Sequence, residues 1–452
     1  MKPVFPLLIA FFAVGFTDAG SADVAPGSIA PNELARKVLQ DERMDAVLKM
    51  GYELLESGMT AGSNYDQVWI RDLNTFIVPL LEVAPRESVR EALLVFLHFQ
   101  DADGNIVDGY VPIANAKKRR YQRTYRYTPT RPQLKAHKNS VETDQESSLI
   151  QAFGRYVRLT GDTSILDEIV RDVPVRERLE MALTYPLKFR FSDKYGLIWG
   201  GTTADWGDIQ PEHPKGVEFD QNSHRAINIY NNALLMIAVE EHVDTIVADN
   251  EVLKRKWQQI HGGLHDAVRE HLWDDAAQKF IPHIYLEEGS PFPGDFDEGQ
   301  IFYHGGTAVA IEAGLLDADE IAASLRKMRE NVEQAGAATI GLNLYPIYPE
   351  GLFLSKSMRS WNYMNGGDWT WFGARMVDQL ARYGFAADAL RELEPMMDRV
   401  LEHGAFREWW TRDNQPMGAK NFKGSAGELI EAIHELRNWA KEQAGAKSDT
   451  LT

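Results

Sequence analysis

Apolar residues recur with a helical period along almost the whole chain, and few folds accommodate such a pattern. The first stretch opens at Pro31-Asn32-Glu33 and continues to Met59, with Leu, Val and Met on one broad face. Alternating strand patterns are scarce, and only 189–199 and 279–285 are predicted to form short hairpin arms. Gly and Pro separate about a dozen predicted helices. The others lie at 71–83, 87–99, 142–159, 175–187, 224–243, 252–272, 307–313, 318–335, 368–383, 386–403 and 426–441.

The connections between these helices are of two kinds. Some are short, and the alternate ones are long and rich in Trp, Tyr, Asp, Glu and Gly. Because barrels collect their functional loops at one end, this alternation predicts a ring of helical hairpins. We therefore expect an all-α fold, an (α/α)6 toroid with long functional loops at one end and minor β-hairpins. The long loops are 60–69, 100–141, 195–222, 287–305, 345–367 and 406–425.

A single domain is predicted between two short end segments. Residues 1–22 have the pattern of an export signal, with Lys2, an apolar run from Leu7 to Phe16, and small residues at 20–22. The alternative is a buried N-terminal helix. An export signal predicts a secreted or periplasmic protein. No later apolar run is long enough to span a bilayer, so we expect no membrane segment after signal removal. The expected division is signal peptide 1–22, linker 23–31, domain 32–445 and tail 446–452.

Composition excludes several classes of partner and site. A formal net charge of −18 argues against a nucleic-acid partner, because such partners need a basic face. The chain has no Cys, so disulfides and thiolate metal sites are excluded. No His or carboxylate spacing matches a metal motif, and we predict neither metal nor cofactor. The basic, tyrosine-rich loop at 117–127 is either solvated or placed to contact an acidic sugar.

The stretch GGTTADWGD, from Gly200 to Asp208, places two carboxylates beside an indole. Its glycines indicate a turn or a close backbone approach, and it lacks the long apolar side chains of a core segment. Asp205 and Asp208 are therefore either solvated or directed into a cleft floored by Trp206.

Glu408 is another candidate functional carboxylate, because aromatic residues flank it in the sequence. It lies between Phe406 and the Trp409-Trp410 pair, where solvation alone does not explain it. It is either paired with Arg407 or Arg412, or it is functional.

Arg71 and Asp72 follow a polar loop and open a predicted helix. Asp72 suits the helix dipole and is either a capping residue or a ligand for sugar hydroxyls beside Arg71. The neighbouring rings of Tyr65 and Trp69 favour a pocket that covers an apolar sugar face.

Two further segments combine polar and aromatic residues at predicted helix starts. Asp144 lies in an acidic helix start, where capping explains at least one carboxylate. Asn365 precedes two glycines that permit a tight turn, which would bring Asn365 and Trp369 toward a ligand. Packing of the helix entry is the alternative role for Trp369.

Four ordered segments resemble the neutral/alkaline invertases and, more loosely, glucoamylases and the glucosidase part of debranching enzymes. The resemblance covers roughly residues 50 to 440 and implies a six-hairpin glycoside hydrolase. The Asp-Arg-Arg-Met sequence of the invertases is absent, which puts sucrose in doubt as the substrate. The segments are NYDQVWIRDL (64–73), VETDQESSLIQAFGRYVRLTGD (141–162), WNYMNGGDWTWFGARM (361–376), and FREWW (406–410) with GSAG (424–427).

The resemblance implies a role for each candidate residue. The family's general acid is an Asp in the Gly200-region loop and its general base is a late Glu, which we match to Asp205 and Glu408. Asp208 is the alternative acid, or the carboxylate that raises the pKa of Asp205. The expected sugar-binding residues are Tyr65, Trp69, Arg71, Asp72, Asp144, Trp206, Asn365, Trp369 and Trp409.

We therefore predict inverting, exo-acting hydrolysis of a small glycoside or a non-reducing-end sugar. A carbohydrate-binding barrel without catalysis is one alternative, because fold does not fix function. A phosphorylase or lyase on the same barrel is another, for which Lys420 and Lys423 are the nearest hint of a phosphate site. The sequence indicates neither the sugar nor the oligomeric state.

Overall fold

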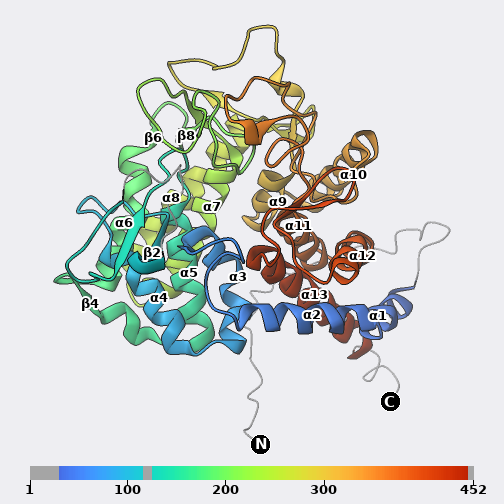
Figure 1. Cartoon of the computed structure of the whole chain (residues 1–452), viewed down its shortest axis with the longest axis horizontal. Helices are drawn as coiled ribbons and strands as arrows, with labels where there is room; N and C mark the ends of the chain where they lie inside the picture. The colour runs from blue at the N-terminus through green and yellow to red at the C-terminus, as the bar shows by residue number, and fades with distance from the viewer. Residues whose placement is uncertain (1–29, 116–124, 446–452) are drawn as a thin grey trace, which may run out of the picture.

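A computed structural model describes residues 30–115 and 125–445 of the 452-residue chain. Within them the fold is helical with small sheets, as predicted (Figure 1). The predicted signal peptide, most of the linker, most of the basic loop and the tail lie outside the described residues. The helices are α1 (Pro31–Leu39), α2 (Glu42–Leu55), α3 (Ile70–Val83), α4 (Arg86–His98), α5 (Gln145–Thr160), α6 (Val175–Phe189), α7 (Ile229–Glu241), α8 (Glu251–His271), α9 (His304–Glu312), α10 (Ala318–Ala335), α11 (Thr370–Arg382), α12 (Ala386–His403) and α13 (Lys423–Gly445).

The odd-numbered helices from α3 to α13 form a closed inner ring. Each packs against the next one along the series, and α13 packs back against α3. The even-numbered helices form the outer layer: α4 and α6 pack on α5, α8 on α7, α10 on α9, α12 on α11, and α2 on α3 and α13. This arrangement of inner and outer helices is the predicted (α/α)6 toroid.

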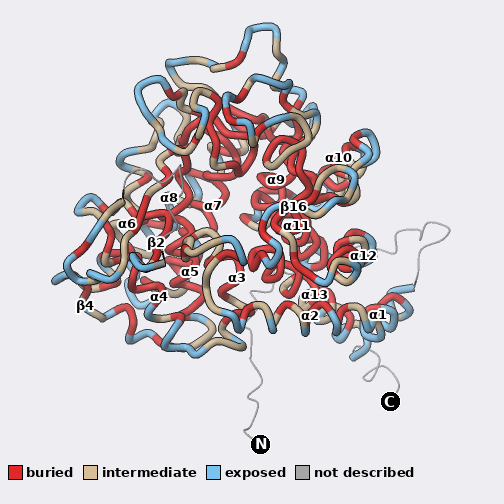
Figure 2. Tube along the Cα trace, in the orientation of Figure 1, coloured by how far each residue is buried: buried red, intermediate tan, exposed pale blue. Residues whose placement is uncertain are grey.

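The two layers differ in burial because the inner helices are covered on both sides. Every residue of α7 from Ile229 to Val239 is buried, whereas the outer helix α8 buries only Trp257, Leu264 and Val268. Figure 2 shows the same contrast across the molecule. A helix that is apolar all round needs such a double cover, and an amphipathic helix needs only one covered face.

The helix boundaries agree with prediction to within a few residues, except at the start. The single helical stretch expected from Pro31 to Met59 is two helices, α1 and α2. Asp41 causes the break, since its side chain accepts a 2.9 Å hydrogen bond from the Arg43 N–H and caps α2.

The strands are short and antiparallel. Strands β6 and β7 form a hairpin in the predicted segment 189–199. The predicted segment 279–285 contains β11 and β12, which belong to different sheets: β11 pairs with β10 and β12 with β9. The sheets are β1 (Val68–Trp69) with β2 (Gly109–Pro112) and β3 (Leu134–His137); β4 (Ile169–Val170) with β5 (Val173–Pro174); β6 (Phe191–Ser192) with β7 (Leu197–Ile198); β8 (Gly200–Gly201) with β9 (Arg225–Ile227) and β12 (Ile284–Tyr285); β10 (Trp273–Asp274) with β11 (Lys279–Phe280); β13 (Phe302–Tyr303) with β14 (Leu344–Tyr345); and β15 (Trp409–Trp410) with β16 (Pro416–Met417).

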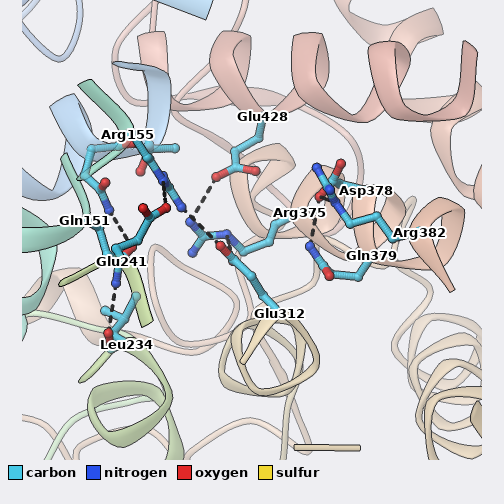
Figure 3. A network of polar contacts seen from close by, with 12 residues as sticks. Gln151, Arg155, Leu234, Glu241, Glu312, Arg375, Asp378, Gln379, Arg382 and Glu428 are labelled. Carbon is cyan, nitrogen blue, oxygen red and sulfur yellow. Dashed lines mark hydrogen bonds and ion pairs between the residues drawn. The ribbon is translucent and has the colours of Figure 1, made fainter. Parts of the chain in front are cut away.

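A network of charged side chains, which we call the axial network, crosses the inside of the ring (Figure 3). Arg375 on α11 pairs with Glu312 on α9 and with Glu428 on α13, both at 3.1 Å. Arg155 on α5 also pairs with Glu312 at 3.1 Å, and it donates to the Asn74 carbonyl on α3 at 2.8 Å. The network lines a second cavity of about 230 Å³.

The length and composition of the helices indicate whether any of them could span a membrane. Among the described helices, none combines the length and the apolar content that a membrane crossing requires.

Candidate active site

A cavity of about 580 Å³ lies where inner helices of the ring begin. Arg71 and Asp72 reach it from the first turn of α3, Trp371 from the first turn of α11, and Phe422 from just before α13. The remaining wall comes mostly from the long loops, which supply carboxylates and aromatic rings. The lining residues are Ala61, Tyr65, Trp69, Arg71, Asp72, Asp108, Glu142, Trp206, Asp208, Ile209, Pro214, Lys215, Val217, Ser355, Ser357, Tyr363, Trp369, Trp371, Glu408 and Phe422.

The Glu408 carboxylate accepts hydrogen bonds from a side-chain hydroxyl and from a backbone N–H. The Tyr65 hydroxyl donates to its Oε1 at 2.7 Å, and the Ala419 N–H donates to its Oε2 at 2.7 Å. The β15–β16 pair sets this geometry because it turns the chain back and brings Ala419 to Glu408. Both donors favour the charged carboxylate, so Glu408 is suited to accept a proton.

Asp208 lies on the same cavity wall in a different environment. Burial raises the pKa of Asp208, the positive charge of Arg71 opposes the rise, and the negative charge of Asp144 adds to it. Its Oδ1 is buried and has no hydrogen-bond partner among the described residues. A carboxyl of this kind retains its proton to higher pH than a solvated Asp and is suited to donate it.

Asp205 does not line the cavity. Its side chain turns away and is 1% exposed, and its two oxygens accept from the Gly305 and Gly306 N–H groups at 2.7 and 2.8 Å. Burial raises the pKa of Asp205 to about 8, and these N–H donors oppose the rise. With both oxygens occupied away from the cavity, Asp205 does not fit the acid role predicted for it.

Arg71 lies on the wall, held from behind by carboxylates. Its Nε pairs with Asp144 Oδ2 at 2.5 Å, and its other side pairs with Glu142. Asp144 is fully buried and also accepts from the Tyr230 hydroxyl at 3.3 Å. Asp144 therefore supports Arg71, while Arg71 and Asp72 face the cavity as expected of sugar ligands.

Four of the predicted aromatic residues line the cavity: Tyr65, Trp69, Trp206 and Trp369. The Trp206 ring stacks on Phe372 at 4.3 Å between centroids and meets Trp369 edge-on at 4.7 Å, so its position is fixed. Rigid rings of this kind can cover the apolar face of a sugar.

Like Asp144, two other predicted sugar ligands lie off the cavity wall. Trp409 is buried and packs against Tyr363 at 6.3 Å between ring centroids. Asn365 is fully buried, where its Oδ1 accepts from the Tyr348 N–H at 2.8 Å and its Nδ2 donates to the Tyr348 and Met358 carbonyls. The Asn365 amide therefore fixes the 345–367 loop.

Sequence reasoning missed several wall residues, of which Asp108 is the most notable. Burial raises the pKa of Asp108 to about 8, although Arg71 opposes the rise. The pKa of the neighbouring Asp72 is raised to about 7, by burial first and also by the charge of Glu408. Nothing around Asp108 sets it apart in sequence, because only the pairing of β1 with β2 brings it to the start of α3. Tyr363, Trp371 and Phe422 were also missed.

Two other predictions concern metals and the basic loop. In residues 30–115 and 125–445, no three or more His, Asp or Glu side chains are grouped to hold a metal ion. Most of the basic, tyrosine-rich loop lies outside the described residues, but Arg126 forms a 2.6 Å ion pair with Asp101.

The sequence matches a family model, and the fold matches solved structures. Residues 50–350 match the family model "Glycosyl hydrolase 94 superfamily, catalytic domain". No curated protein matches the sequence. The fold is similar to a GH63 mannosylglycerate hydrolase from Thermus thermophilus in complex with glucose, with a TM-score of 0.59, 14% identity, and coverage of 85% of this chain and 99% of that chain.

Two rhamnosidases are also similar in fold. One, from Klebsiella oxytoca with rhamnose bound, has a TM-score of 0.57 at 14% identity, covering 87% of this chain and 63% of that chain. The other, a GH78 family rhamnosidase of Bacillus sp. GL1, has a TM-score of 0.55 at 15% identity, covering 85% and 34%. At these identities the likeness concerns the fold.

Proposed function

The chain belongs to the Glycosyl hydrolase 94 superfamily catalytic-domain family, and from this premise we propose that it hydrolyses a small glycoside with inversion, using Asp208 and Glu408. The family match also confirms the predicted six-hairpin glycosidase superfamily and makes the protein a glycosidase. The particular reaction and the residue roles are the proposal.

One observation carries this proposal: Asp208 and Glu408 lie on the wall of a single cavity in opposite electrostatic settings. Glu408 receives two hydrogen bonds that stabilise its charge, while burial raises the pKa of Asp208. Two carboxyls whose environments separate their protonation states are the arrangement that acid–base hydrolysis of a glycoside requires. The cavity of about 580 Å³ is within the usual range for small-molecule sites.

In the proposed reaction, Asp208 gives its proton to the glycosidic oxygen as the bond to the anomeric carbon breaks. Glu408 takes a proton from a water molecule, whose oxygen forms the new bond to the anomeric carbon from the opposite face. Arg71 and Asp72 hold sugar hydroxyls, and the rings of Trp69 and Trp206 cover the apolar face of the sugar. Activity should fall as pH rises through the raised pKa of Asp208, because the acid is then lost.

Phosphorolysis is less well supported by the charges around the cavity. Among the described wall residues the cations are Arg71 and Lys215, and Arg71 is already paired with Glu142 and Asp144. Lys423, one of the two possible phosphate-binding residues predicted from the sequence, donates instead to the Thr60 carbonyl at 2.9 Å. Five carboxyls lie on the wall, from Asp72, Asp108, Glu142, Asp208 and Glu408, and those that are ionised would repel phosphate.

Substrate and location are part of the same proposal. The acidic wall favours an uncharged sugar in the inner part of the cavity, and an exo mode suits a cavity of this size. Since one protein of similar fold is a mannosylglycerate hydrolase, mannosylated and glucosylated small acids belong in the substrate screen. The export pattern of residues 1–22 supports action in the periplasm or outside the cell.

A product-resolved screen of disaccharides and of these glycosylated acids, followed by variant kinetics on the best substrate, tests the proposal. We expect Asp208→Asn and Glu408→Gln each to lower kcat roughly thousandfold or more, the scale expected when an acid–base group is lost. The exposed residues Asp413 and Glu402 provide matched controls, Asp413→Asn and Glu402→Gln, which should retain activity. Full activity in either folded test variant would contradict the assignment, and no turnover of any glycoside would favour a binding protein.

A further inference from the structure

We propose that Asp205 is a positioning residue, which fixes the loop that carries Asp208 by clamping it to the beginning of α9. This inference rests on the proposed function, because it assumes that Asp208 acts as the general acid. It assigns to Asp205 a role outside the cavity, in place of the acid role that its sequence setting favours.

The clamp consists of two hydrogen bonds that cross the fold. The Gly305 and Gly306 N–H groups lie in the first turn of α9, where backbone N–H groups have no partner within the helix. They donate to Asp205 Oδ2 and Oδ1 at 2.7 and 2.8 Å. In its ionised form, the Asp205 carboxyl also interacts favourably with the helix dipole. Asp205 thus caps a helix about a hundred residues farther along the chain.

The approach is so close that both positions on α9 require glycine. A Cβ on Gly306 would lie 2.8 Å from Asp205 Oδ1, and one on Gly305 would lie 2.9 Å from Oδ2 and collide with the Trp206 ring. Asp205 itself has a φ of 54°, in the left-handed region that few residues other than glycine adopt. A conformation that costs free energy persists where surrounding contacts enforce it, and the clamp supplies those contacts.

A second tether holds the same loop just before Asp205. The Tyr303 hydroxyl, immediately before α9, donates to the Thr203 carbonyl at 3.3 Å, and Thr203 Oγ1 donates to the Asp205 carbonyl at 3.0 Å. The Tyr303 hydroxyl is also 2.5 Å from that of Tyr348, which donates to Glu298 at 2.6 Å. The loop is therefore tied to α9 and to the 287–305 and 345–367 loops.

The clamp acts on Asp208 through a short, fixed turn. The Gly207 N–H donates to the Ala204 carbonyl at 3.1 Å, which closes the turn between the two aspartates. Asn139 Nδ2 holds the far side of the turn by donating to the Asp208 carbonyl at 3.2 Å. Loosening the Asp205 end would move the Asp208 carboxyl relative to the leaving oxygen, and a misplacement of about 1 Å can cost about a hundredfold in rate.

The experiment compares two leaving groups in two variants and one control. In Asp205→Asn, one N–H donor of α9 loses its acceptor and faces an amide NH₂ instead. In Thr203→Val, the loop loses the hydrogen bond between Thr203 Oγ1 and the Asp205 carbonyl with little change in volume. The control is Asp317→Asn, because Asp317 accepts from the N–H groups of Asp319 and Glu320 at the start of the outer helix α10.

The probes are the methyl and 2,4-dinitrophenyl glycosides of whichever sugar the screen identifies. The dinitrophenolate leaves without protonation, so its release does not depend on the acid. We expect kcat for the methyl glycoside to fall roughly a hundredfold in Asp205→Asn and less in Thr203→Val, with kcat for the dinitrophenyl glycoside nearly unchanged and Asp317→Asn like the wild type. The basic limb of the pH profile should also move to lower pH, as Asp208 becomes more hydrated.

The outcomes distinguish a positioning role of Asp205 from a merely structural one. An equal fall for both glycosides would mean that Asp205 has only a structural role, and unchanged kinetics would mean that the clamp is dispensable; either result overturns the inference. If Asp205→Asn fails to fold, the leaving-group contrast in Thr203→Val decides the question in the same way. An Asp208→Asn variant that retains full activity on the methyl glycoside would instead refute the proposed function.

Discussion

At the scale of single residues, a few contacts distinguish Asp205, the proposed positioning residue, from Asp208, the proposed acid. Asp205 and Asp208 belong to one loop and burial raises the pKa of both, yet Asp205 has both oxygens occupied by N–H donors while Asp208 Oδ1 has no partner among the described residues. Glu408 is held by Tyr65 and Ala419 at 2.7 Å each. The proposed base thus has donors that favour its charge, whereas burial favours the protonated form of the proposed acid.

Gly418 lies directly against Glu408, which allows a test of how accurately this carboxylate must be placed. Gly418 has a φ of +65°, and a Cβ there would lie 2.5 Å from Glu408 Oε2. We expect Gly418→Ala to displace the carboxylate and lower kcat roughly 10- to 100-fold, as measured by steady-state kinetics. Gly336→Ala is the matched control, because Gly336 also has a φ of +65° but no atom within 4 Å of the added Cβ.

Both alanine variants should lose about 1–2 kcal/mol of stability, the cost of a left-handed backbone for a residue with a side chain. Only Gly418→Ala should lose activity as well. Equal activity in the two variants would show that Glu408 tolerates displacement, which the proposed mechanism does not permit.

The sequence pointed to Glu408 and to the loop of Asp205 and Asp208, but it favoured Asp205 as the acid, whereas Asp208 is the one of the two that lines the cavity. Glu408 was recognisable because a carboxylate among Phe406, Trp409 and Trp410 has no ordinary solvated role. Asp205 and Asp208 could not be separated, since the difference between them depends on a left-handed backbone and on a contact with α9 about a hundred residues away. Asp108 gave no local signal at all.

At the scale of elements, the inner helices are held together by charge as well as by apolar packing. In the axial network, the Arg375 side chain of α11 connects α9 and α13 through Glu312 and Glu428 (Figure 3). Burial and neighbouring carboxylates raise the pKa values of Glu428 and Glu431, the latter to about 7. Such groups are stable inside a protein only while their partners remain in place.

Removing one member of this network should therefore weaken the ring. We expect Arg375→Met to destabilise the protein by about 3–5 kcal/mol, because it removes the cation that pairs with Glu428 in the interior and leaves Glu312 with Arg155 alone. Urea denaturation followed by circular dichroism measures the loss. Arg391→Met is the control, since Arg391 is two-thirds exposed and its 3.8 Å pair with Asp388 should contribute about 1 kcal/mol or less. Equal unfolding midpoints for the two variants would mean that the network does not hold the ring.

Elements of different length were not equally predictable. The helices could be predicted because each is long enough to repeat its apolar period several times, as in α10 and α12, whose bounds match the expected ones. The break at Asp41 was missed because the apolar face continues across it. Strands of two residues, such as β15 and β16, are too short to show alternation and depend on pairing between distant segments.

At the scale of the whole molecule, the ring of helices contains two separate polar cavities. The aromatic and acidic cavity lies where inner helices begin, and the axial network lies farther along the same helices, between residues such as Arg155 and Glu431. The alternation of long and short loops predicted the ring, but neither the closure of α13 on α3 nor the axial network has a sequence signature. Both arise only when helices from the two ends of the chain meet.

The central claim is that water, activated by Glu408, attacks a sugar whose leaving group is protonated by Asp208. The most direct test is proton NMR of the first product formed from the best substrate in phosphate buffer. We predict a free sugar whose anomeric configuration is opposite to that of the substrate, with no sugar phosphate. A first product that retains the configuration of the substrate, or one that is a sugar phosphate, would contradict the account.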